Sequence, residues 1–78
     1  MASHDDLERV VTVYRSARLG PVEAAEALTS DGYRPIEVGF VLTRALRVPL
    51  TEAMEFAQAA EDRLTRGLLS PRLARHGA

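Results

Sequence analysis

The apolar residues of this chain recur at helical spacing in four segments. In the first segment they fall at i, i+3, i+4, i+7 and i+10, which is typical of one face of an amphipathic helix. This stripe consists of Leu7, Val10, Val11, Tyr14 and Ala17. Ser3 is the expected amino-terminal cap, and Gly20 followed by Pro21 ends the first helix and begins the second.

The second segment is short and rich in alanine, and runs from Pro21 to about Ser30. The face expected to be buried comprises Val22, Ala25 and Leu28, with Ala24 and Ala27 beside it. These small side chains predict close packing against a neighbouring helix. Ser30-Asp31-Gly32 then supplies a turn, in which Gly32 is free to adopt a left-handed conformation.

The third segment, from Pro35 to Val48-Pro49, is apolar on nearly every side of the expected helix. Its few polar positions are Glu37, Thr43, Arg44 and Arg47. A helix of this kind is either the central helix of a bundle or is half-covered by another chain. Gly39 costs about 1 kcal/mol relative to alanine in mid-helix, and so predicts a close helix crossing.

A fourth helix is expected from Thr51, its predicted cap, to Gly67, which ends it. Its stripe comprises Leu50, Ala53, Met54, Ala57, Ala60 or Glu61, and Leu64. The four segments together predict an all-α fold, a small four-helix bundle. We expect a single domain over residues 1–67, followed by a basic, flexible tail over residues 68–78.

The amino-acid composition excludes several kinds of catalytic and metal-binding site. The 78 residues are 46% hydrophobic with a formal net charge of −1, which describes one small domain. The chain has no cysteine, which excludes thiol nucleophiles and thiolate metal sites, and no lysine, which excludes a Walker-type phosphate site. His4 and His76 have no second ligand at metal-binding spacing. We therefore expect no enzyme activity, no cofactor and no metal.

The source and location follow from the same composition. The absence of lysine and asparagine beside abundant arginine and alanine indicates a GC-rich coding sequence and hence a bacterial protein. The amino-terminal residues lack the basic region of a secretory signal, and no apolar run approaches the roughly 18 residues of a membrane span. A cytoplasmic protein with no membrane partner is expected.

Charge is unevenly distributed along the chain. Residues 1–62 hold all eleven acids and six arginines, a sum of −5, whereas residues 63–78 hold four arginines and no acid, a sum of +4. The basic residues of the second part are Arg63, Arg66, Arg72 and Arg75. They could bind a nucleic-acid backbone or an acidic partner. The alternative is structural, because arginine favours a helix carboxyl end and Asp62 can pair with Arg66 at i+4.

A resemblance to a known family covers residues 26–60. It is carried by Leu28, Gly32-Tyr33, Val38, Val41-Leu42 and Ala53-Met54-Glu55-Phe56. This pattern resembles the ubiquitin-associated (UBA-like) three-helix domain, which has a Gly-aromatic loop, an apolar second helix and an Ala-Val-Glu-aromatic sequence in its third. The resemblance implies an interaction module with an additional amino-terminal helix, binding through Gly32, Tyr33 and the fourth helix. Asp31 replaces the apolar residue of ubiquitin-binding members, which argues against ubiquitin itself.

Two functions remain open. The first is a non-catalytic protein-protein interaction module, an adaptor or regulatory subunit, either binding another protein or forming a homodimer. Its candidate partner-binding residues are Gly32, Tyr33, Phe40, Arg44 and Arg47. The alternative is a helix-turn-helix-like DNA-binding regulator that uses the arginine-rich tail. Its turn, residues 29–34, is longer than the motif's, and its recognition helix offers few polar side chains to bases.

Overall fold

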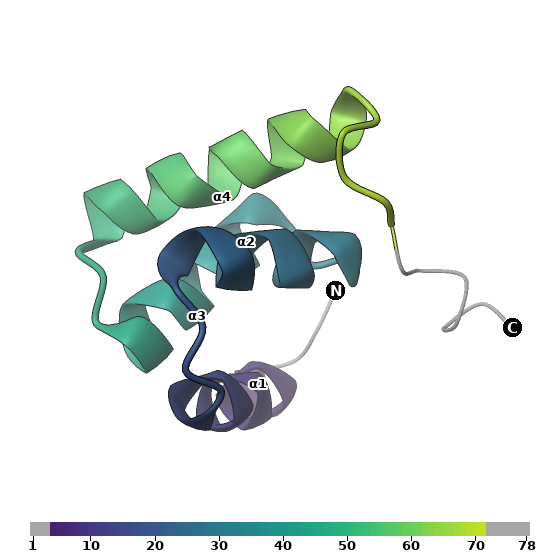
Figure 1. Cartoon of the computed structure of the whole chain (residues 1–78). Coiled ribbons are helices and arrows are strands. Elements are labelled where there is room, and N and C mark those ends of the chain that lie inside the picture. The colour runs from purple at the N-terminus through teal and green to yellow at the C-terminus, as the bar shows by residue number, and fades with distance from the viewer. Residues whose placement is uncertain (1–3, 72–78) are drawn as a thin grey trace, which may run out of the picture.

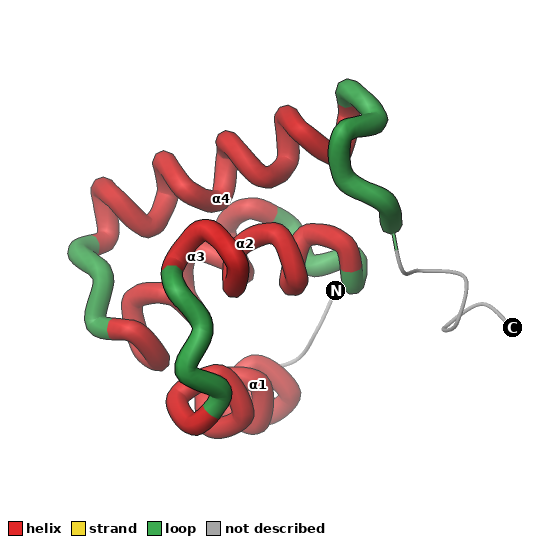
Figure 2. Tube along the Cα trace, viewed as in Figure 1, coloured by secondary structure: helices red, strands yellow, loops and turns green. Residues whose placement is uncertain are grey.

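A computed structural model describes residues 4–71 and shows a small all-α protein of four helices (Figure 1). The helices are α1 (His4–Ser16), α2 (Pro21–Ser30), α3 (Pro35–Leu46) and α4 (Leu50–Thr65). Short connections join consecutive helices, and the described range contains no strand (Figure 2). The predicted all-α fold, a four-helix bundle, is confirmed.

Helices α2 and α3 begin in the same way, with a proline at the first position and a glutamate two residues later. Glu23 Oε1 accepts a hydrogen bond from the Gly20 N–H at 3.1 Å, and Glu37 Oε1 accepts one from the Arg34 N–H at 2.8 Å. Proline forfeits no helical hydrogen bond at this position, and the glutamate satisfies an amide just outside the helix. The starts expected at Pro21 and Pro35 are confirmed.

Helices α2 and α4 both end at a glycine in the left-handed region. Gly32 has φ 99° and Gly67 has φ 78°, values that a residue with a Cβ adopts at a cost. After Gly32 the chain reverses, and the Tyr33 N–H donates to the Leu28 carbonyl at 3.1 Å. This is the Schellman arrangement of a helix carboxyl end. The Gly32-Tyr33 pair therefore has a local role, because it ends α2 and returns the tyrosine to the last turn.

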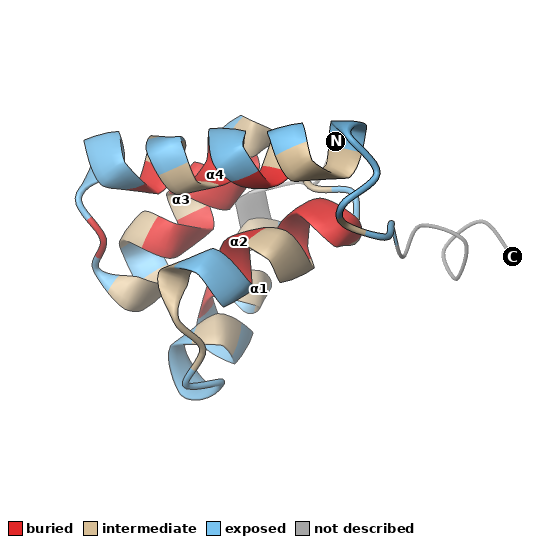
Figure 3. Ribbon diagram, turned by 45° about the horizontal axis from the view of Figure 1, so that its top comes forward, coloured by how far each residue is buried: buried red, intermediate tan, exposed pale blue. Residues whose placement is uncertain are grey.

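Helix α3 is the central helix of the bundle. It packs against α1, α2 and α4, and its Val38, Val41 and Leu42 are fully buried. Buried residues lie on the faces that α2, α3 and α4 turn toward one another, as Figure 3 shows. Most of the apolar surface of α3 is therefore covered within one chain, whereas Ile36 at its start is 69% exposed.

Small residues permit the close approach of the helices. The fully buried alanines are Ala24 and Ala25 of α2, with Ala53, Ala57 and Ala60 of α4. Where α3 crosses α4, a Cβ built on Gly39 would overlap the sulfur of Met54. The predicted close crossing at Gly39 is confirmed. Since interaxial distance depends on the side chains at the contact, these residues let α4 lie directly on α2 and α3.

Two residues of the apolar stripes expected in α2 and α4 are exposed. Val22 and Leu50 are exposed, although they belong to the faces predicted to be buried in α2 and α4. Each lies in the first turn of its helix, whereas the buried positions begin further along, at Ala24 in α2 and Ala53 in α4. The stripe pattern identified the correct face and placed its start too early.

Two predicted helix ends are also wrong. Ala17 falls beyond α1, which ends at Ser16 because the chain leaves the helical conformation and Arg18 is left-handed, with φ 57°. Thr51 is not a cap, because α4 begins one residue earlier and Pro49 occupies the cap position without a side-chain hydrogen bond. The cap predicted at Ser3 lies outside the described residues.

The Gly39–Met54 contact predicts that Gly39→Ala changes the free energy of unfolding in opposite directions in two genetic backgrounds. Gly39→Ala adds helix propensity of about 1 kcal/mol but crowds Met54, and overpacking typically costs about 1–3 kcal/mol. We expect a net loss of about 1 kcal/mol in the wild-type chain. In a Met54→Ala background the same change should stabilise the fold by about 0.5–1 kcal/mol. Urea unfolding followed by circular dichroism measures both, and stabilisation in both backgrounds would contradict the tight crossing.

Candidate functional site

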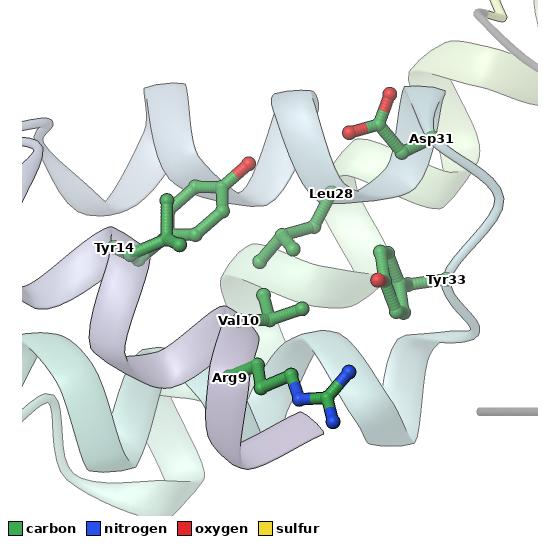
Figure 4. A pocket seen from close by; sticks show the side chains of 7 residues that line it. Arg9, Val10, Tyr14, Leu28, Asp31 and Tyr33 are labelled. Carbon is green, nitrogen blue, oxygen red and sulfur yellow. The ribbon is translucent and has the colours of Figure 1, made fainter. Parts of the chain in front are cut away.

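An apolar groove lies between α1 and α2, with Tyr33 at one end (Figure 4). Its volume is about 160 Å³. The residues that line it are Arg9, Val10, Val13 and Tyr14 of α1, Leu28 of α2, and Asp31 and Tyr33 of the following turn. In Figure 4, Tyr14 and Tyr33 lie at opposite ends, with Val10 and Leu28 between them. The centre of the groove is therefore apolar, and its charged groups come from Arg9 and Asp31.

The groove exists because α1 packs mainly against α3. Arg44 of α3 donates two hydrogen bonds to the Glu8 carboxylate of α1, at 3.0 and 3.3 Å. Arg15 Nη2 donates to the Arg44 carbonyl at 3.4 Å, and Val11 of α1 is buried in the core. These contacts hold α1 on α3 and leave the sides of α1 and α2 that line the groove apart.

Tyr33 lies among carboxylates. Burial raises the pKa of its hydroxyl above the ordinary value, and the negative charges of Asp31, Glu37 and Asp6 raise it further because they oppose the tyrosinate. Asp6 belongs to α1, Asp31 caps α2, and Glu37 belongs to α3 and is only 6% exposed. Arg9 Nη1 lies 4.0 Å from Asp6 Oδ1 and offsets part of this charge. The Tyr33 end of the groove therefore favours positive charge.

A second hollow lies between the Gly32-Tyr33 turn and α4, with a volume of about 300 Å³. It is lined by Thr29, Gly32, Tyr33, Arg34, Pro35, Glu61 and Leu64. Tyr33 thus borders hollows on both sides of the turn. This second hollow is the more polar of the two, and it connects the predicted turn surface to the carboxyl end of α4.

The structure divides the predicted partner-binding residues into two groups. Gly32 and Tyr33 lie before the start of α3, whereas Arg44 and Arg47 lie at its other end, and 12 residues of helix span about 18 Å. The Arg44 guanidinium lies 5.4 Å from the ring centroid of Phe40 and binds Glu8 of the same chain. Tyr33 borders the groove and shares the second hollow with Gly32, and Arg44 is engaged in holding α1.

The basic residues at the end of α4 form pairs within the chain. Arg63 Nε lies 2.6 Å from Glu26 Oε2 and connects α4 to α2. Arg66 Nε lies 3.1 Å from Asp62 Oδ2, so the predicted i,i+4 pair is confirmed. Arg72 and Arg75 lie outside the described residues. Of the two interpretations of Arg63 and Arg66, this geometry favours the structural one.

The turn between α2 and α3 differs from the one predicted when a helix-turn-helix was considered. The connection between α2 and α3 is residues 31–34, shorter than predicted, because Thr29 and Ser30 are buried residues of α2. The objection that the turn is too long is therefore wrong. The other objection gains weight, since Ile36 and Arg44 are the exposed residues of α3 and Arg44 is paired with Glu8. Such a helix offers base edges few hydrogen-bonding groups.

Sequence reasoning missed the groove because it assigned Val10 and Tyr14 to the core, whereas each is only partly buried and also lines the groove. Val13, which is 62% exposed, lies off the predicted stripe and widens the apolar surface of α1 toward the groove. The available signal was the sequence Val10-Val11-Thr12-Val13-Tyr14, which is apolar over more than one helical face. An apolar arc broader than one stripe indicates that a helix contacts the core on one side and something else on another.

Two specific features, a metal-ligand cluster and a membrane-spanning helix, are not found in the described part of the chain. Within residues 4–71 no group of three or more His, Cys, Asp or Glu side chains could hold a metal ion. None of the described helices is long and apolar enough to cross a membrane. Comparison with protein-family models, curated proteins and solved structures finds no match. The function is therefore inferred from the geometry of the groove.

Arg47 gives a prediction about stability. It has φ 58° at the end of α3, where the left-handed turn directs buried Val48 into the core. Glycine relieves a cost of about 1–2 kcal/mol but gains freedom in the unfolded chain. We expect Arg47→Gly to raise the free energy of unfolding by about 0.5–1 kcal/mol. The control Gln58→Gly, at an exposed position inside α4, should lower it by about 1 kcal/mol. Urea unfolding measures the free energy of unfolding of the two variants. A loss of stability in Arg47→Gly as well as in Gln58→Gly would contradict backbone strain at Arg47.

Tyr33 gives a prediction about pH. Because its folded-state pKa is raised, the folded protein holds the phenolic proton more tightly than the unfolded chain. The associated stability is present below the unfolded value of about 10 and is lost as the pH rises through the folded-state pKa. In a Tyr14→Phe variant, tyrosinate absorbance should report Tyr33 alone and titrate at higher pH folded than in denaturant. Asp31→Asn should lower that folded-state pKa, and no change would contradict the charge contribution.

Proposed function

We propose that this protein is a small non-catalytic protein-interaction module, an adaptor or regulatory subunit, that binds its partner through the groove between α1 and α2. The observation that carries the proposal is the apolar centre of the groove, bordered by Tyr14, Tyr33 and exposed Val13. The chain has two tyrosines and both line it. Tyrosine is enriched at protein interfaces because its large, rigid ring buries much area at low entropic cost.

The size of the groove favours a protein side chain over a small molecule. Pockets for cofactors and metabolites typically enclose about 300–1,000 Å³ and place several polar groups around the ligand. This groove has about 160 Å³ and an apolar centre. That space suits one aliphatic side chain inserted as an anchor, with the remainder of the partner lying across α1 and α2.

The resemblance to UBA-like domains supports the same region, because it assigns the Gly32-Tyr33 turn to a binding surface. DNA binding receives less support. The α3 helix is central and mainly apolar at its surface, and Arg63 and Arg66 lie beside carboxylates of their own chain. A second copy of this chain is among the possible partners, and the mass of the complex distinguishes it from another protein.

Site-specific photocrosslinking in cells that produce the protein tests the proposal. A photoreactive residue replaces Arg9, which lines the groove, or Gln58, which is exposed on α4 and serves as the matched control. We expect a discrete product from position 9. Val13→Asp should reduce its yield about tenfold, because a carboxylate placed against apolar contacts costs on the order of 1.4 kcal/mol or more.

Val13 is exposed, so the variant should retain the fold, which thermal unfolding verifies. Tyr33→Ala provides a second variant of the groove. A product of twice the chain's 8.5 kDa identifies a homodimer, and any other mass identifies a different partner. Equal products from positions 9 and 58, or a yield at position 9 that neither variant changes, would refute the groove as the binding surface.

A further inference from the structure

We infer that the groove selects a partner segment that carries arginine or lysine within four residues of an aliphatic side chain, on either side of it in the sequence. The inference rests on the proposed function, since it names the chemistry of the partner at that same site. It follows from two neighbouring environments, an apolar centre that suits an aliphatic anchor and an acidic end that suits a cation.

The apolar centre accounts for the aliphatic residue. Val10, Leu28 and the ring of Tyr14 surround a space of about 160 Å³. A polar side chain inserted there would give up hydrogen bonds to water without finding partners, which costs free energy. A leucine, isoleucine or methionine side chain fills such a space and buries apolar surface on both molecules.

The acidic end accounts for the basic residue. Three carboxylates from separate elements, Asp6, Asp31 and Glu37, act on the Tyr33 hydroxyl, and Arg9 is the one cation among the described residues that line the groove. Asp31 itself lines the groove beside Tyr33. A carboxylate has several lone pairs and can accept a guanidinium or ammonium donor in addition to its existing contacts. A cation from the partner therefore finds complementary charge next to the anchor position.

The negative charge of these carboxylates disfavours two other classes of partner. An acidic peptide and a nucleic-acid backbone would both place negative groups against these carboxylates, which is unfavourable at short range. The basic residue therefore contributes specificity, because it distinguishes permitted segments from rejected ones that carry the same aliphatic anchor.

A random peptide library displayed on phage and selected on the full chain tests the inference. We expect the enriched peptides to share an aliphatic residue with arginine or lysine within four positions of it, before or after. A synthetic copy of an enriched peptide should change the tyrosine fluorescence, which reports the groove because the protein lacks tryptophan and both tyrosines line it. Its affinity should fall as salt is raised.

Variants at Asp31 separate charge from shape. Asp31→Asn should weaken the synthetic peptide about three- to tenfold, whereas Glu52→Gln, at an exposed acid in the first turn of α4, should leave it unchanged. Asp31→Lys reverses the charge at a helix carboxyl end, where a cation is favourable. Selection on that variant should lose the basic residue and retain the aliphatic one.

Several outcomes would overturn the inference. Enriched peptides that are acidic or lack the basic residue would refute the partner chemistry while leaving the groove as an interaction site. Equal effects of Asp31→Asn and Glu52→Gln would do the same. The chain's own residues 72–75 read Arg-Leu-Ala-Arg, which also combines an aliphatic residue with arginine. If peptides are enriched only on a variant that carries Arg72→Gln and Arg75→Gln, this segment is the occupant of the groove, and an external partner is refuted. No enrichment on any variant would refute the inference outright, and the photocrosslinking result then decides the proposed function separately.

Discussion

The close contact between α3 and α4 at Gly39 is the constraint on which the rest of the structure depends. With no Cβ at this position, Met54 packs directly over the α3 backbone, and the alanines of α4 reach the core. The core of this chain consists mainly of valine, leucine and alanine. Such short side chains fill a core at normal density only if the helices lie close together. Gly39 therefore gives up helix propensity for an approach that the rest of the core requires.

The groove follows from this arrangement. Once α2 and α4 cover two sides of α3, α1 occupies a further side and is held there by the Glu8–Arg44 pair and buried Val11. Helix α1 then cannot also close against α2, and an apolar space remains between them. Tyr33 borders this space because the Gly32 turn returns the chain to Leu28 through a backbone hydrogen bond. The residues that end α2 thus also build the end of the site, so the site is held by helix geometry.

The sequence contains most of the information about the helices and little about the groove. Pro21, Pro35, Gly32 and Gly67 act through backbone conformation, a local property that can be recognised from neighbouring residues alone, and the helices begin or end where they indicate. Arg18 and Arg47 adopt left-handed conformations without glycine. The reason is tertiary, since the path to the next helix requires them, and no local pattern indicates it.

The candidate site depends on which faces of different helices meet, and periodicity within one helix does not specify that. The apolar stripe of α1 correctly placed Val11 in the core, but it could not separate Val10 and Tyr14, which also face the groove. Arg44 illustrates the same limit. Its position suggested a partner contact, whereas its donors bind Glu8, 36 residues away in the chain. The resemblance to UBA-like domains identified the Gly32-Tyr33 turn, and the structure explains that pair as a helix end.

Net charge conceals the electrostatic character of this surface. The formal value of −1 averages over arginines and carboxylates that occupy different places. Arg44, Arg63 and Arg66 lie against Glu8, Glu26 and Asp62, so these three cations are directed at contacts within the chain. At the Tyr33 hydroxyl the electrostatic effect comes instead from carboxylates, and Arg9 alone opposes them among the described residues that line the groove. Because Coulomb interactions beyond about 8–10 Å are largely screened at physiological ionic strength, a partner in the groove responds to this local charge and not to the molecular total. Anchor and charge are therefore specified by side chains from three helices that meet at one turn.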